Sequence, residues 1–286
     1  MRYRFLRFPQ GKTKAVTLSY DDACCSDIQL SEIITSYGIK GTFNINSTWL
    51  AKDDRHLTPE DVVEHILDKG HEVALHGAKH IALGNVRALE GIREVLDCRI
   101  ELEKTFGRII RGMAYADCGI IHMNNGASYE NIRQYLKDLD IAYARALGKE
   151  NNTFMLPTDW YTWMPTVHNT NPQVLEYADK FVAIDVNGDY PATRMPRLFY
   201  LWGHSYEFER EDGWKLLDSL CQKLAHNADT WYATNIEIYD YVNAYQSLVF
   251  SADNSIVYNP SLFKVWFDID GEMFCVSPGE TLTLGR

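Results

Sequence analysis

The sequence of 286 residues predicts an α/β fold: a distorted (β/α) barrel of about seven strands with a small C-terminal antiparallel β appendage. Short β-rich segments alternate with helical ones over most of the chain, which is typical of parallel strands joined by crossover helices. From about Ser251 the helical segments stop, and only strand-like segments follow. We therefore expect a barrel over residues 1–250 and an appendage over residues 251–286 that packs on it.

The predicted barrel strands are short runs of apolar and β-branched residues, the composition of strands that are buried on both faces. They are 14–20, 40–45, 71–75, 108–114, 141–146, 181–186, 197–203 and 230–234. Helical patterns lie between them. One begins with Thr58 as a hydroxyl cap and Pro59 in the first turn, and a longer one runs from Val86 to Phe106. Seven or eight such units are consistent with a distorted barrel.

The predicted appendage contains three strand-like segments, 256–258, 263–269 and 273–276. The dipeptide Asp270-Gly271 joins the last two and is a strong signal for a tight hairpin. No residue pattern in this tail indicates chemistry.

Composition excludes several classes of partner. The net charge of −11 argues against nucleic acid, because phosphate binding needs a basic face. No stretch approaches the ~20 apolar residues of a membrane-spanning helix, so no membrane partner is expected. Six cysteines without regular spacing are typical of reduced thiols, which predicts a cytoplasmic protein. A secreted mature form is left open, and the sequence does not indicate the oligomeric state.

Two short segments carry a candidate metal site: Tyr20-Asp21-Asp22 and His76-Gly77-Ala78-Lys79-His80. If the second segment forms a helical turn, its two imidazoles lie on one face and can converge on one ion. One Asp then completes a His/His/carboxylate set of the kind that holds catalytic zinc. The other Asp is free to accept a proton from a water molecule.

The adjacent aspartates can share a site only where a strand ends. Within a strand, neighbouring side chains point to opposite faces, but the predicted strand 14–20 ends just before Asp21 and Asp22. In α/β barrels and open α/β sheets, functional residues gather at this carboxyl edge. The sequence therefore predicts a site at the carboxyl edge of the barrel.

The order of these motifs resembles that of a known family. Thr17-Leu18-Ser19-Tyr20-Asp21-Asp22, then Gly70-His71-Glu72-Val73-Ala74-Leu75-His76 with His80, then Leu201-Trp202-Gly203-His204 are similar to its motifs. The family is that of the polysaccharide deacetylases with a NodB homology domain, or carbohydrate esterase family four. The resemblance covers roughly residues 14–245 and implies a metal-dependent deacetylase on a distorted barrel.

The resemblance also implies a role for each motif residue. The implied general base is Asp21, the implied metal ligands are Asp22, His76 and His80, and the implied general acid is His204. The position of His204 after an apolar strand at the carboxyl edge fits this role, since imidazole titrates near neutrality. His168 is the next candidate for the acid.

The chain departs from the family pattern at two places. Ala23 stands where the first motif usually ends in Gly. The third motif, Arg-x-Pro-Tyr/Phe-Gly, supplies an Arg that orients the base and a backbone N–H for the oxyanion. If Tyr115 is its aromatic residue, Arg111 lies one residue too far away; otherwise Ala114 takes the Arg position and Asp117 the aromatic position. Both alignments stay open, with Arg111 and Tyr115 as candidate substrate-binding residues.

Three tryptophans are further candidates for substrate contact. Trp160, Trp163 and Trp202 carry aromatic faces of the kind that stack on sugar rings. Trp is also common in partly buried cores, so either role is open for each of them.

The sequence therefore predicts a hydrolase that removes acetyl groups from an N-acetylated carbohydrate, with an O-acetylated one as second choice. One divalent ion, zinc first, is the expected cofactor, although imidazole also suits iron, nickel and copper. Two alternatives stay open. One is a metal-dependent amidase acting on a cyclic amide that is not a sugar. The other is a carbohydrate-binding relative weakened in catalysis, which the altered third motif would explain.

Overall fold

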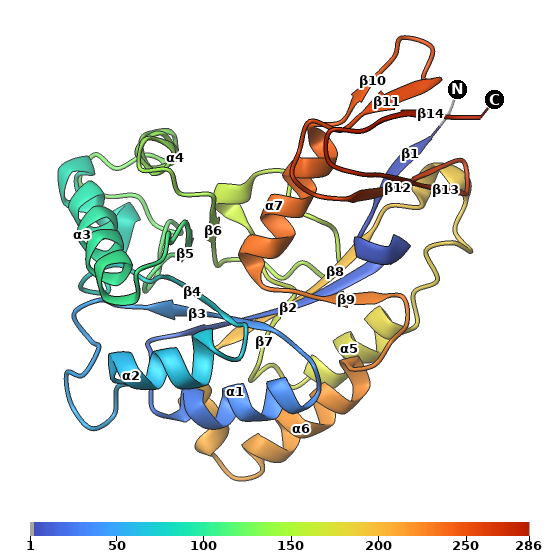
Figure 1. Cartoon of the computed structure of the whole chain (residues 1–286). Helices are drawn as coiled ribbons and strands as arrows, with labels where there is room; N and C mark the ends of the chain where they lie inside the picture. Colours follow the sequence, from blue (N-terminus) through green and yellow to red (C-terminus); the bar gives the residue numbers. More distant parts are fainter. Residues whose placement is uncertain (1–2, 286) are drawn as a thin grey trace.

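The computed structural model describes residues 3–285 and consists mainly of a strand barrel surrounded by helices (Figure 1). The barrel strands follow the order β6-β5-β4-β3-β2-β8-β7, and β9 pairs with the start of β2. All of these pairings are parallel. The predicted distorted (β/α) barrel of about seven strands is confirmed.

The barrel strands are β2 (Lys14–Asp21), β3 (Gly41–Ile45), β4 (Glu72–Leu75), β5 (Gly112–Ala114), β6 (Tyr143–Arg145), β7 (Val167–His168), β8 (Arg197–Gly203) and β9 (Thr230–Tyr232). The α-helices are α1 (Ser26–Ser36), α2 (Pro59–Val62), α3 (Ala88–Phe106), α4 (Tyr129–Asp138), α5 (Val174–Val182), α6 (Gly213–Leu224) and α7 (Asn235–Gln246). Thr58 caps α2 as predicted, since its hydroxyl accepts from the backbone N–H of Asp61. Helix α3 ends at Gly107, which has the left-handed conformation that favours glycine.

The segment from Trp163 to His168, which includes β7, closes the barrel between β6 and β8. Trp163 exchanges backbone hydrogen bonds with Ala144 and Ala146 beside β6, whereas Thr166 donates to Tyr200 of β8. The opposite side is irregular, because β2 pairs with β9 near its start and with β3 near its end. The barrel is therefore closed but distorted.

One predicted strand is wrong. Residues 181–186 contain the end of helix α5 and the turn that follows it, and the short strand β7 takes the position in the sheet instead. The apolar run from Phe181 to Ile184 does not by itself distinguish a helix end from a buried strand. Phe181 is fully buried, but it packs from the helix layer.

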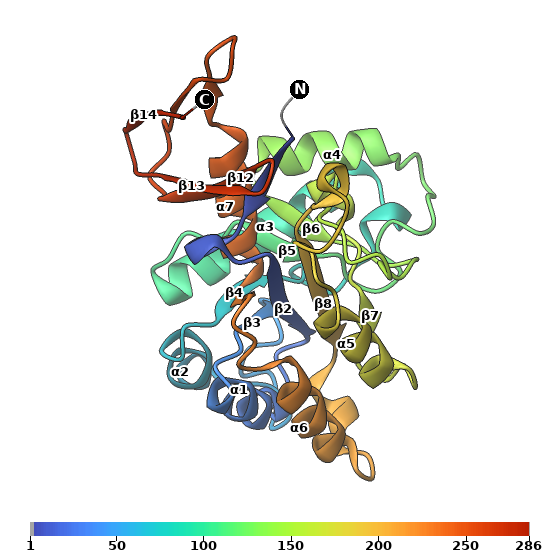
Figure 2. The same cartoon turned by 90° about the vertical axis from the view of Figure 1, so that its right-hand side faces the viewer.

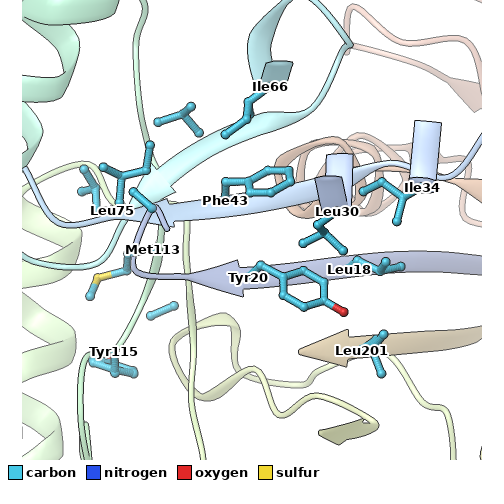
Figure 3. Close-up of a cluster of buried hydrophobic side chains, with 14 of the residues drawn as sticks. Leu18, Tyr20, Leu30, Ile34, Phe43, Ile66, Leu75, Met113, Tyr115 and Leu201 are labelled. Carbon is cyan, nitrogen blue, oxygen red and sulfur yellow. The ribbon is translucent and has the colours of Figure 1, made fainter. Parts of the chain in front are cut away.

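Alternate residues of the strands face the helices and the barrel interior. Figure 3 shows Leu18 and Tyr20 of β2 beside Leu30 and Ile34 of α1, within the apolar layer between sheet and helices. Between these positions, Thr17, Ser19 and Asp21 face inward and are all buried. The inward positions of β2 from Thr17 to Asp21 therefore form a polar row that ends at the carboxyl edge of the barrel.

The C-terminal residues form two small antiparallel sheets, as expected (Figure 2). Their strands are β1 (Arg4–Arg7), β10 (Val249–Phe250), β11 (Ile256–Tyr258), β12 (Val265–Ile269), β13 (Glu272–Val276) and β14 (Thr281–Thr283). The hairpin at Asp270-Gly271 is confirmed, since Ile269 pairs with Glu272 and both turn residues have positive φ. The sequence did not indicate that β1, at the start of the chain, pairs with β12. The division near residue 250 stays a prediction.

Helix α7 joins the appendage to the barrel. The Tyr241 hydroxyl donates to the carbonyl of Arg7 and accepts from the backbone N–H of Trp266, so it binds two strands of one appendage sheet. Among residues 3–285, none of the helices combines the length and apolar character that a membrane crossing requires.

Candidate active site

The two adjacent aspartates lie at the carboxyl edge, where the chain leaves strand β2. Asp21 is the last residue of β2, and Asp22 turns the backbone with a φ of 82°. Ala23 follows with a φ of 52°, a conformation that glycine adopts at lower cost. This turn brings the carboxylates of Asp21 and Asp22 to the same site, both nearly buried.

The two histidines converge from a loop, and the helical turn considered for them is wrong. His76 directly follows β4, and the segment from His76 to His80 has no helical structure. Gly77 has a φ of 82° and His80 a φ of 61°, so the loop folds back on itself. The loop geometry therefore brings the imidazoles together without a helix, with ring centroids 4.9 Å apart.

Asp22, His76 and His80 have the geometry of a metal site. Asp22 Oδ1 lies 3.6 Å from Nε2 of His76 and 3.6 Å from Nε2 of His80. Tetrahedral bonds of roughly 2.0–2.1 Å separate neighbouring ligand atoms by roughly 3.4 Å, so one zinc-sized ion fits between these three atoms. Among the described residues, no donor satisfies the buried Asp22 Oδ1. The donor set therefore fits a divalent ion.

The surroundings of His76 favour a metal-binding imidazole. Its Nδ1–H donates to the carbonyl of Ala114 at 3.1 Å, which leaves Nε2 free to face Asp22. Burial lowers the pKa of His76, although Asp21 and Asp22 oppose this shift. The neutral ring that results is the form that binds metals. On the other side of the site, Trp49 stacks on His80 with ring centroids 5.2 Å apart.

Asp21 is held as an oriented carboxylate. Arg145, at the end of β6, donates from Nη2 to Asp21 Oδ2 at 2.5 Å, and Asn44 of β3 donates to Oδ1 at 2.8 Å. Burial alone would raise the pKa of Asp21, but the Arg145 guanidinium holds that pKa below its ordinary value. Asp21 is therefore ionised near neutrality and suited to accept a proton.

Arg111 does not reach this site. It precedes β5, at the amino edge of the barrel, and its guanidinium binds Asp240 of α7 at 2.9 Å. Ala114 lies at the carboxyl end of β5, so the structure favours the alignment in which Ala114 takes the Arg position of the third motif. The guanidinium beside Asp21 comes from Arg145 on the neighbouring strand, a residue that the sequence analysis missed.

Tyr115 is also placed differently from the expectation. Its backbone N–H donates to the carbonyl of Arg145 at 3.0 Å, so this group is not free to bind an oxyanion. Its hydroxyl donates to the carbonyl of Tyr161, and the side chain is 1% exposed. Tyr115 is therefore a core residue without access to a substrate.

His204 reaches the site from the end of β8 and approaches Asp22 from the oxygen that His76 and His80 do not face. Its Nε2 lies 3.7 Å from Asp22 Oδ2, and its side chain is partly exposed. Burial acts to lower the pKa of His204, but Glu207, Asp21 and Asp22 together raise it above the ordinary value. His204 therefore tends to carry a proton, as a general acid must.

Only one of the three candidate tryptophans lies at the site. Trp163 is fully buried, and Trp160 packs against Trp163 and Tyr239 in the same core cluster. Trp202 lies between Arg145, whose guanidinium carbon is 4.5 Å from the ring centroid, and His168 at 4.4 Å between ring centroids. Trp202 therefore packs beside the guanidinium that orients Asp21.

Two residues at the site were missed by the sequence analysis although a signal for each was present. Asn44 pairs with Asp21 in the parallel register of β2 and β3, so it occupies the same carboxyl edge. Glu207 follows His204 by three residues, a spacing that returns a side chain to the start of a short helix. Arg145 lacked such a signal, because nothing in the sequence fixed the end of β6 relative to β2.

Comparison with known proteins supports the family assignment. Residues 9–144 match the family model for polysaccharide deacetylase. A putative polysaccharide deacetylase from Mycobacterium smegmatis has a similar structure, with a TM-score of 0.58, 17% identity, and coverage of 84% of this chain and 94% of that one. A mutant CE4 family pseudoenzyme with restored enzymatic activity, from Bacillus anthracis, gives a TM-score of 0.51 at 14% identity, covering 82% of this chain and 70% of that one.

At these identities the two structures show a shared fold alone. No curated protein matches the chain. The match to the family model covers residues 9–144, just under half of the chain, and confirms the resemblance to polysaccharide deacetylases that the motifs indicate.

Proposed function

We propose that this chain hydrolyses the N-acetyl group of a carbohydrate, using one divalent ion, with zinc as the first choice. The observation that carries the proposal is the convergence of a base, a metal-binding trio and an acid at one edge of the barrel. Asp22 lies within 4 Å of His76, His80 and His204, and Asp21 lies beside His76. These are the groups that amide hydrolysis requires.

Asp22, His76 and His80 would hold the ion, and Asp21 would act as the general base. When bound, such an ion acts as a Lewis acid on the acetyl carbonyl and lowers the pKa of water towards neutrality. Asp21 is fixed by Arg145 and Asn44, so its carboxylate faces the site in one orientation. It accepts the proton of the attacking water.

His204 would donate the proton that the departing amine needs. An amine is a strongly basic leaving group, and proton transfer to it contributes about 10²- to 10⁴-fold in rate. The raised pKa of His204 keeps the ring protonated closer to neutrality, which supports this role. His168, the second candidate acid, contacts Glu207 at 3.4 Å, and its ring centroid lies 6.3 Å from that of His204.

The altered third motif makes a catalytically weakened relative the second candidate. Ala114 stands at the position of the motif Arg, and the backbone N–H of Tyr115 is occupied. The contact between Arg145 and Asp21 favours the active enzyme, because it restores a guanidinium at the base. Turnover is therefore expected despite the altered motif.

A substrate screen tests the proposal. Zinc-loaded protein is incubated with N-acetylated oligosaccharides, acetylated xylan and cyclic amides, and released acetate and amine are measured. Acetate and free amine in equal amounts from the first class support N-deacetylation. Product from xylan alone would reassign the enzyme to esters, and ring opening of cyclic amides would favour the non-sugar amidase. No product from any class, with the metal bound, would favour the binding relative.

A further inference from the structure

Glu207 connects the two histidines on the acid side of the site. It belongs to the short 3₁₀ helix Ser205–Glu209, directly after His204. Its Oε2 accepts from the backbone N–H of His204 at 3.1 Å and lies 3.4 Å from Nε2 of His168. Its Oε1 lies 3.6 Å from Nδ1 of His204. One backbone N–H and two imidazole nitrogens therefore lie within 3.6 Å of one carboxylate, whose side chain is 13% exposed.

The contacts of His168 fix which of its nitrogens carries the proton. The backbone N–H of Thr170 donates to Nδ1 of His168 at 3.2 Å, so this nitrogen must be an acceptor. In the neutral ring the proton then resides on Nε2, which faces Glu207. His168 is therefore a donor to Glu207.

The same contacts disfavour a second metal centre at this position. Ligand atoms of His168, His204 and Glu207 lie within 4.8 Å of one another, a spacing that would fit an ion. An imidazole nitrogen that carries a proton has no lone pair for a metal, and the only other nitrogen of His168 is bonded to Thr170. Instead, the imidazoles of His168 and His204 lie 3.4 and 3.6 Å from the Glu207 carboxylate, at ion-pair distance.

We propose that Glu207 is a positioning residue for His204, and that His168 is the positioning residue for Glu207. In the protonated ring of His204, Nδ1–H faces Glu207, and Nε2–H, which carries the proton that the amine receives, faces Asp22 and the scissile amide. The proposal rests on the proposed function, because it takes His204 as the acid. Tyr206 supports the same orientation, since its ring packs on His204 with centroids 5.2 Å apart.

Glu207→Gln tests the proposal with almost no change of shape. A carboxylate offers two acceptor oxygens to the three donors, whereas an amide offers one oxygen and one NH₂ group. The NH₂ group would face an N–H of either His204 or His168, so one of the two contacts is lost. We expect His204 to lose its fixed tautomer in this variant.

The first readout is spectroscopic and does not depend on turnover. Long-range ¹H–¹⁵N spectra of zinc-loaded protein labelled at histidine report the tautomer of each ring, with His204→Gln for assignment. At a pH high enough to make the His204 ring neutral, the proposal predicts a proton on Nδ1 in the wild type and a mixture of tautomers in Glu207→Gln. An unchanged His204 ring in that variant would overturn it. If the wild type proves inactive on every acetylated substrate, the proposed function fails, but this readout still decides the positioning role.

The second readout compares two leaving groups within each variant. Glu207→Gln is expected to lower kcat for an N-acetyl sugar by roughly 10- to 100-fold, with KM and metal content unchanged. Hydrolysis of an activated acetyl ester, which needs no acid, should change less than about threefold. Equal losses on both substrates would contradict the proposal and assign Glu207 a structural role.

Three further variants complete the design. His168→Phe keeps the packing against Trp202 but removes the donor to Glu207. The loss of kcat on the N-acetyl sugar should therefore be smaller than in Glu207→Gln.

The matched control is Glu211→Gln. Glu211 is an exposed glutamate two residues beyond the helix, and wild-type rates on both substrates are expected. Glu207→Asp retains both acceptor oxygens, so partial activity on the amide substrate is expected. This variant also replaces Glu207→Gln if the glutamine variant does not fold. In that case, a His204 ring with no preferred tautomer in Glu207→Asp would overturn the proposal.

Discussion

Glu72 at the amino edge and Asp22 at the carboxyl edge of the barrel interior are both buried carboxylates, but their hydrogen-bond partners differ. At the amino edge, Glu72 accepts hydrogen bonds from the Thr42 hydroxyl at 2.9 Å, the Tyr143 hydroxyl at 2.7 Å and the backbone N–H of Ile236 at 2.8 Å. At the carboxyl edge, Asp22 Oδ1 has no donor among the described residues. A buried polar atom without a partner costs stability, so its persistence at one edge points to a ligand there.

The two arginines show the same contrast. Arg111 at the amino edge pairs with Asp240, and both side chains are about one-third exposed. Arg145 at the carboxyl edge pairs with Asp21, and these side chains are 1% and 2% exposed. Exposed pairs contribute about 0–1 kcal/mol to stability, whereas removing one partner of a buried pair costs about 3–5 kcal/mol. The exposed pair at the amino edge therefore contributes little to stability, whereas the buried pair at the carboxyl edge fixes the Asp21 carboxylate in place.

The largest expected effect is at the aspartate pair. Asp21→Asn should keep the metal and lower the hydrolysis rate by about 10²- to 10⁴-fold, because it removes the proton acceptor and not a ligand. Asp22→Asn should lose both metal and activity. Metal content and rate are measured together on folded protein. Equal loss of metal in the two variants would require the base and ligand roles to be reassigned.

A matched pair of arginine variants separates the two edges. Arg145→Lys keeps a positive charge but loses the planar fork beside Asp21, so kcat should fall roughly 10- to 100-fold with the metal retained. Arg111→Lys at the amino edge should leave kcat within about twofold of the wild type, because its partner Asp240 is far from the site. Similar kcat losses in both variants would contradict the division of roles between the edges.

Glu72→Gln should affect stability and leave metal binding intact. Three donors face Glu72, and an amide offers one acceptor oxygen in place of two, so a loss of about 1–3 kcal/mol in the free energy of unfolding is expected. Denaturant unfolding with and without zinc measures it. Loss of metal in the folded variant would show that the two edges are coupled.

The stability of the wild type should also depend on pH through Glu72. Burial raises the pKa of Glu72 to about 7 from an ordinary value of 4.5. Between these values the folded state keeps a proton that the unfolded state releases, so this contribution is fully present below about pH 4.5 and is lost as pH rises through about 7. The stability difference between the wild type and Glu72→Gln should therefore be larger at pH 5 than at pH 8. A difference that grows with pH would contradict the assignment.

The smallest expected effect is at Ala23. Its φ of 52° costs about 1–2 kcal/mol relative to glycine, while its buried methyl group contributes about 0.8 kcal/mol. Ala23→Gly should therefore change the free energy of unfolding by no more than about 1 kcal/mol, in the stabilising direction. A clear loss of stability in chemical denaturation would show that the methyl group matters more than the backbone strain.

The sequence predicted the residues at the ends of β2, β4 and β8 because each follows an apolar strand at a recognisable boundary. Asp21, Asp22, His76, His80 and His204 are all brought together at the carboxyl edge. Arg145 was missed because its partner lies 124 positions away, and only the closed barrel places β6 opposite β2. Arg111 and Tyr115 were misplaced because β5 is shorter than the apolar run 108–114 suggests, so the register of the third motif could not be fixed.

The central claim is that the carboxyl edge binds one divalent ion through Asp22, His76 and His80. Zinc content after equilibrium dialysis tests it most directly, in the wild type and in a His76→Ala, His80→Ala double variant. A double variant of two exposed histidines, His122→Ala and His226→Ala, is the matched control. We predict about one zinc per chain in the wild type and the control, and almost none in the His76, His80 variant. Full zinc occupancy in that variant would contradict the account.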